Sequence, residues 1–133
     1  MEYILHGNNN SVIISDIRFF EEDEEFPSNT LCLLKVHSNN FSGVVEFDLN
    51  IKCLAEFSRN LKSMYDTLTG HAVLKETYEP SYIDISSAGN GHFTVSGSLN
   101  LVFPRHLLEF EFDIDQTMLR DFAYSLYNDF SKH

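Results

Sequence analysis

The chain has 133 residues, the length of one domain, and 43% of them are hydrophobic, with twelve phenylalanines. This supply of large apolar side chains excludes a disordered chain. Nine basic against twenty acidic residues give a net charge of −11, which repels nucleic acid and anionic membranes and attracts basic proteins. We therefore expect one domain spanning residues 1–133, with neither nucleic acid nor membrane as a partner. The charge is equally consistent with a role in solubility alone.

Targeting signals and cysteine usage indicate the compartment. No apolar run reaches membrane-spanning length, and the N-terminal sequence MEYILHGNNN lacks the layout of a signal peptide, so a cytoplasmic protein is expected. Cys32 falls in an apolar strand pattern and Cys53 in an apolar helix pattern. They form no metal-binding motif, and we expect both to be buried free thiols.

The N-terminal part of the chain predicts two strands and an acidic loop. A short strand at 3–5 and a turn at 7–10 precede a strong strand over 11–20, which is rich in β-branched and aromatic residues. Five consecutive acids follow, here called the acidic loop: Glu21, Glu22, Asp23, Glu24 and Glu25. Such a block repels itself and cannot sit in a core, so it is exposed. It is either a solvated connector or a landing site for a cationic partner.

The middle of the chain predicts two strands and a helix. The strands cover 30–37 and 44–47, with a turn at 38–40, and Asp48 or Asn50 is placed to cap the following helix. Apolar residues spaced by three and four form one stripe along that helix: Ile51, Leu54, Phe57, Leu61, Met64 and Leu68. We expect this stripe to pack on a sheet, and Gly70 to end the helix.

The C-terminal half predicts four more strands and a second helix. The strands cover 71–77, 82–86, 91–99 and 108–114, and Asn90-Gly91 is a strong hairpin signal. Asp115 is placed to cap a last helix with one apolar face, formed by Leu119, Phe122, Ala123, Leu126 and Phe130. The predicted fold is α+β, an antiparallel β-sheet of about seven to eight strands packed with two amphipathic helices. One helix follows the fourth strand and the other lies at the C-terminus.

The strand over 108–114 also carries charge. Its apolar residues alternate with Glu109, Glu111 and Asp113, a period of two that is typical of a strand with one buried and one solvent-facing side. No basic residue on this strand neutralises the three carboxylates, so they are further candidates for contact with a cationic partner.

Catalytic and metal-binding patterns are weak. Glu109, Glu111, Asp113 and Asp115 resemble a carboxylate cluster, but residues two apart along a strand lie about 7 Å apart, and Asp115 is needed as a cap. His71 and His92, with Ser96 and Ser98, are the only hydrolase candidates, and no nucleophile motif surrounds them. A phosphate-binding glycine loop is missing. We expect no catalytic residue, metal or cofactor, and a binding module is favoured.

Three segments resemble one known family. The strand sequence GHFTVSGSL at 91–99, the sequence LEFEF at 108–112 and the junction Asp115-Gln116-Thr117 resemble the C-terminal half of the WapI family of bacterial immunity proteins. The resemblance extends over about residues 12–130. It implies a cytoplasmic, non-enzymatic antidote that binds the C-terminal domain of a polymorphic toxin. Such toxins are delivered by contact between neighbouring bacteria and are often nucleases.

The resemblance and the charge are mutually consistent. A nuclease binds polyanions and is therefore basic, and an acidic protein can cover that surface in place of nucleic acid. The alternative is an adaptor of the same fold with a non-toxin partner. Whether the chain is a monomer or a dimer stays open, since unpaired strand edges permit dimers.

Overall fold

The computed structural model describes residues 1–133 and contains two antiparallel four-stranded sheets and two helices. The first sheet contains β1 (Glu2–Gly7), β2 (Asn10–Phe19), β3 (Thr30–Ser38) and β4 (Phe41–Leu49). The second sheet contains β5 (His71–Lys75), β6 (Tyr82–Gly89), β7 (His92–Leu101) and β8 (His106–Asp115). Helix α1 (Ile51–Thr67) connects the sheets, and α2 (Gln116–Phe130) ends the chain. The predicted α+β class, with one helix after the fourth strand and one at the C-terminus, is confirmed. The strands form two sheets.

Within each sheet the strands follow one another in chain order. The tight turns between them use asparagine in the left-handed region, with φ of 58° at Asn9, 54° at Asn39 and 54° at Asn90. Asparagine tolerates this conformation because its short side chain bonds locally to the backbone. The three turns predicted from Asn and Gly are therefore confirmed.

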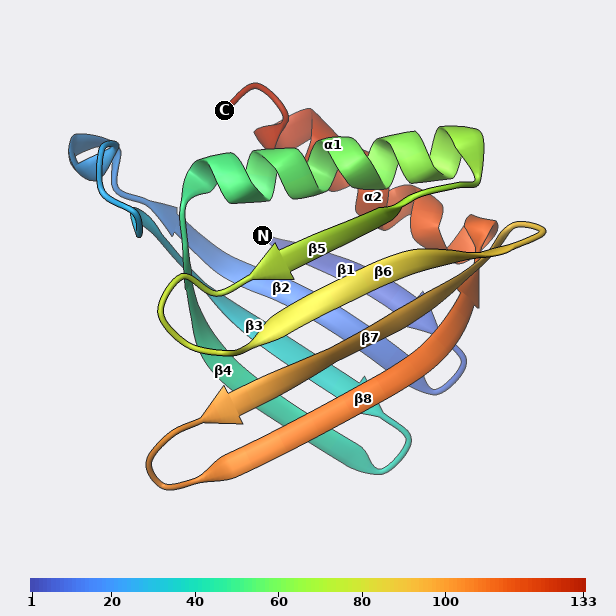
Figure 1. Cartoon of the computed structure of the whole chain (residues 1–133), viewed down its shortest axis with the longest axis horizontal. Coiled ribbons are helices and arrows are strands. Elements are labelled where there is room, and N and C mark those ends of the chain that lie inside the picture. The colour runs from blue at the N-terminus through green and yellow to red at the C-terminus, as the bar shows by residue number, and fades with distance from the viewer.

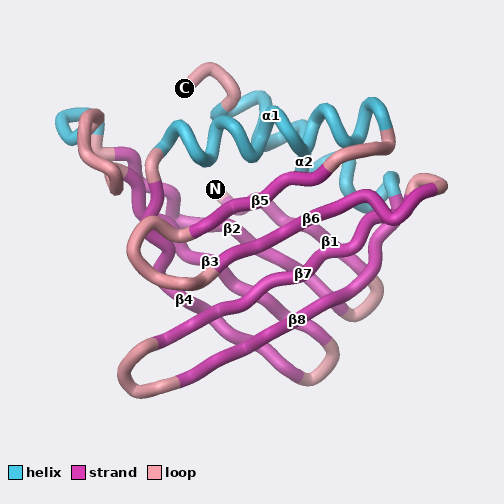
Figure 2. The backbone as a smooth tube through the Cα atoms, viewed as in Figure 1, coloured by secondary structure: helices cyan, strands magenta, loops and turns pink.

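The core lies between the two sheets and beneath the helices. The sheets face each other, and both helices lie across one open end of the pair (Figure 1). The trace in Figure 2 shows the same arrangement, with both helices on one side of the two crossing sheets. Each strand buries alternate residues, and the largest fully buried side chains come from all of these layers: Phe47, Phe57, Phe93 and Phe122.

Both helices begin at predicted caps. The Asn50 side chain accepts a hydrogen bond from the Lys52 N–H at 2.9 Å, and Asp115 accepts one from the Met118 N–H at 3.1 Å. Helix α1 contacts α2 as well as β5, and the rings of Phe57 and Phe122 meet edge to face with their centroids 6.4 Å apart. The apolar stripe of α1 therefore packs against a helix in addition to the expected sheet.

The β7–β8 hairpin is longer than its sequence pattern indicates. Its strands run to Leu101 and from His106, so the connection is the four-residue turn at 102–105, with a cis peptide bond before Pro104. Gly97 faces the core, where a Cβ atom would lie 2.7 Å from Cζ of Phe110 and would collide with the Tyr82 carbonyl. Only glycine therefore fits at this position without displacing the backbone of β6.

One expectation about the cysteines is wrong. Both are free, but only Cys32 is buried, whereas Cys53 is exposed on α1. Burial, followed by the charges of Glu76 and Asp48, raises the pKa of the Cys32 thiol to about 12. At about 100° per residue, Cys53 lies roughly 100° from the middle of the buried side of α1, so it stands at the edge of the apolar stripe, where its side chain is exposed.

Neither α1 nor α2 is long and apolar enough to cross a membrane.

Candidate binding surface

The acidic loop is exposed but anchored. Its first three residues form a short 3-10 helix, and all four of its glutamates are exposed. The buried Asn29 donates from Nδ2 to the Glu24 carbonyl at 3.2 Å and accepts from the Ile51 N–H at 2.8 Å. Asn50 donates from its side chain to the Phe26 carbonyl at 3.0 Å. The loop is therefore tied to the start of α1 and holds its charges in a defined place.

The carboxylates of β8 form a second acidic surface. Glu109, Glu111 and Asp113 are exposed, while the alternate residues Phe110 and Phe112 are buried, so the predicted register is correct. These carboxylates lie on the solvent-facing side of β8, the last strand of the second sheet. The acidic loop lies beside the start of α1, so the structure does not bring the two predicted acidic sets together.

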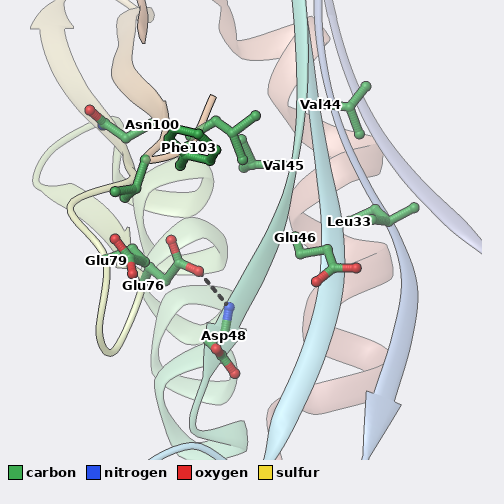
Figure 3. A pocket seen from close by; sticks show the side chains of 11 residues that line it. Leu33, Val44, Val45, Glu46, Asp48, Glu76, Glu79, Asn100 and Phe103 are labelled. Carbon is green, nitrogen blue, oxygen red and sulfur yellow. Dashed lines mark hydrogen bonds between the residues drawn. The ribbon is translucent and has the colours of Figure 1, made fainter. Parts of the chain in front are cut away.

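A third surface, which we call the trough, was not predicted. It is a hollow of about 650 Å³ between β4 on one side and the β5–β6 connection and β7–β8 turn on the other (Figure 3). Eleven residues line it: Leu33, Val44, Val45, Glu46, Asp48, Glu76, Glu79, Asn100, Leu101, Val102 and Phe103. None of them is Lys or Arg, so the trough is negative.

Glu76 and Asp48 lie together at the end of the trough nearest α1. The Asp48 N–H donates to Oε2 of the half-buried Glu76 at 3.1 Å, as the dashed line in Figure 3 shows. Burial, with smaller contributions from the charges of Asp48 and Glu79, raises the pKa of Glu76, although the hydrogen bond from Asp48 works in the opposite direction. The Ser28 hydroxyl donates to Oδ1 of Asp48 at 2.6 Å, so the segment following the acidic loop contacts the trough.

The other end of the trough is apolar and unusually exposed. Phe103 is 90% exposed and Val102 65%, and Val44 on β4 faces solvent as well. Adjacent exposed apolar side chains with a polar rim are typical of protein-binding surfaces. The available signal in the sequence was Leu101-Val102-Phe103 immediately before Pro104, because hairpin turns are normally polar.

The residues considered for catalysis are dispersed. His71 and His92 are exposed at the starts of β5 and β7, and neither makes a hydrogen bond to Ser96 or Ser98. Ser98 is buried, although it alternates with the buried Leu99 along the strand, and its hydroxyl accepts a hydrogen bond from the Asn100 side chain at 2.8 Å.

The carboxylates considered for a metal do not form a metal site either. Asp115 accepts hydrogen bonds from the Thr117 hydroxyl and the Met118 N–H, and these bonds lower the pKa of its carboxyl. No three His, Cys, Asp or Glu side chains lie close enough together to hold a metal ion.

The model of the Immunity protein WapI-like family matches residues 4–133, nearly the whole chain. The match includes the acidic loop, the trough and the β8 carboxylates. No curated protein matches the chain.

Proposed function

The chain belongs to the WapI-like immunity protein family, and from this premise we propose that it binds one cognate toxin domain and neutralises it by covering the toxin's active surface. Inhibition by occlusion requires no chemistry from the immunity protein. In this proposal the chain has no catalytic residue, metal or cofactor of its own.

The distribution of charge supports a basic partner. Of the twenty acidic side chains, only Asp66 makes a salt bridge, with Lys62 at 2.8 Å. The remaining carboxylates lack a basic partner within the protein, so their field extends into solvent and attracts cations. A toxin that cleaves nucleic acid has a basic surface for its substrate, and we therefore propose a nuclease as the target.

The candidate contacts are the acidic loop, Glu21 to Glu25, and the β8 carboxylates Glu109, Glu111 and Asp113. Exposed charges of this kind mainly increase the rate of association and determine which partner is bound. A protein interface of ordinary size, about 1,600 Å² in total, is sufficient for nanomolar binding when its central contacts are well packed. The setting we propose is the cytoplasm of a bacterium that receives such toxins from its neighbours by contact.

Co-expression tests this function. The toxin candidate is the C-terminal domain of the protein encoded immediately upstream, expressed with and without this chain. We expect the domain alone to stop growth, and the pair to grow and to co-purify. An unrelated protein of equal negative charge is the matched control, and it should not rescue growth.

Two outcomes would contradict the proposal. If the upstream domain stops growth while this chain is present in folded form, the chain is not its antidote. If the upstream domain is harmless alone yet co-purifies with the chain, the chain is an adaptor for a non-toxin partner.

A further inference from the structure

Strand β4 is the last strand of the first sheet and has one free edge. At Asp48 that edge is occupied, because its N–H donates to the Glu76 side chain and its carbonyl accepts from the Thr77 N–H at 2.8 Å. Along a strand, the backbone groups of alternate residues point to the same side. Glu46 and Val44 therefore direct their N–H and carbonyl groups to the same edge as Asp48.

These groups have no partner in the protein. Residues 42–47 form backbone hydrogen bonds only within the ladder between β3 and β4. The bonds on the free edge of β4 are those at Asp48. Proteins usually block or cover such an edge, because it accepts another strand. Here the edge opens into the trough, with Glu76 and Glu79 facing it from the opposite side (Figure 3).

We propose that an extended, lysine- or arginine-bearing segment of the toxin domain adds to β4 as a fifth strand of the first sheet and fills the trough. The identity of the partner rests on the proposed function. The segment hydrogen-bonds to the backbone of Val44 and Glu46, as in other cases of strand addition. Its basic side chains reach Glu76 and Glu79, and its apolar side chains contact Phe103.

Charge complementarity favours this occupant over a second copy of the chain. Two copies joined through β4 would each carry a charge of −11 and would place two sets of unpaired carboxylates against each other. Like charges across an interface oppose association, whereas a cationic segment relieves the repulsion around Glu76. The exposed Phe103 supplies an apolar anchor of the aromatic type enriched at interface centres.

Amide hydrogen exchange, followed residue by residue by NMR, tests the edge directly in the unmodified protein. In the free protein the amides of Val44 and Glu46 should exchange faster than those of Val45 and Phe47, which bond to β3. In the complex with the upstream toxin domain, Val44 and Glu46 should become protected by at least about tenfold. Unchanged exchange at both amides in a stable complex would overturn the proposal.

Two sets of variants locate the contact independently. Glu46→Pro removes one edge N–H without removing a bond to β3, and edge strands tolerate proline. Glu76→Gln with Glu79→Gln removes two charges from the trough, and the control pair Glu56→Gln with Asp121→Asn removes two exposed charges from the helices. We expect the first two variants to weaken toxin binding by about tenfold or more and the control pair on the helices to weaken it much less.

The outcomes separate this inference from the proposed function. If the wild-type chain binds and inhibits the toxin but neither Glu46→Pro nor the Glu76 and Glu79 pair weakens binding more than the control pair does, the family role stands and the strand addition is wrong. If the wild-type chain does not bind the upstream domain at all, both are wrong. Should Glu46→Pro fail to fold, the exchange measurement and the charge variants still decide.

Discussion

Glu76 is a residue whose position opposes folding at neutral pH. It is half-buried and faces two other carboxylates, so its pKa in the folded protein is raised above the ordinary value of 4.5. Between those two pKa values the folded protein holds more protons than the unfolded chain, and the free energy of unfolding therefore falls as pH rises. Residues that lower stability in this way are often retained for function.

Glu76→Gln should accordingly stabilise the protein at pH 7. The amide oxygen can still accept from the Asp48 N–H, while the unfavourable charge is removed. We expect the melting temperature to rise by roughly 1–3 °C, a modest gain because the carboxylate still reaches solvent. The gain should shrink as the pH falls and vanish below pH 4.5, where Glu76 is neutral in both states.

Glu56→Gln on the exposed surface of α1 is the matched control, and thermal melts of both variants from pH 3 to pH 8 make the comparison. A gain at Glu76 that is independent of pH, or a lower melting temperature at pH 7, would contradict the assignment of an unfavourable charge there.

Gly97 is a residue that the packing of the second sheet requires. A Cβ atom at this position would press on the Phe110 ring and the Tyr82 carbonyl, and the carbonyl belongs to the backbone of β6, which cannot move aside cheaply. Gly97→Ala should destabilise the protein by about 2–4 kcal/mol in urea unfolding. The neighbouring Ser96→Ala, on the outer face, should cost no more than about 0.5 kcal/mol. Equal stability of the two variants would contradict this account, because it would show that β6 and the Phe110 ring can shift to admit a methyl group.

At the scale of elements, most of the architecture follows from local patterns. Alternation placed the strands, three-and-four spacing placed both helices, and Asn50 and Asp115 act as caps where the sequence put them. Cys53 was misassigned because a single apolar residue next to the stripe of α1 was counted as part of it. Its helical phase, about 100° per residue, places it at the edge of the stripe, where periodicity alone does not decide burial.

The acidic loop is the element whose role in association can be isolated. Changing Glu22 and Glu25 to Gln removes two exposed charges without touching the hydrogen bonds that anchor the loop. We expect the association rate with the toxin domain to fall by about two- to fivefold at low salt, with a shallower dependence on ionic strength and a nearly constant dissociation rate.

Glu56→Gln with Asp121→Asn removes the same charge from the helices and should have a smaller effect in the same stopped-flow measurement. If the two double variants behave alike, net charge alone governs association and the loop is only a solvated connector.

At the scale of the whole molecule, the sequence predicted the family and the fold class but not how the surfaces meet. Periodicity assigns strands to a buried or exposed side, yet it does not say that α1 divides them into two sheets. The trough is made by residues from β4, from the β5–β6 connection and from the β7–β8 turn, so no single pattern marks it. The exposed turn residues Val102 and Phe103 were the one usable signal in the sequence, since the residues of a turn are normally polar and an apolar pair there indicates a contact outside the turn.

Titration of purified toxin activity tests the central claim most directly. The domain encoded upstream is mixed with increasing amounts of this chain, and its activity on its own substrate is measured at physiological salt. Occlusion by a specific complex predicts that activity falls in proportion to added chain and reaches background at about one equivalent, as tight binding requires. A toxin that keeps its full activity in the presence of excess folded chain would contradict the account.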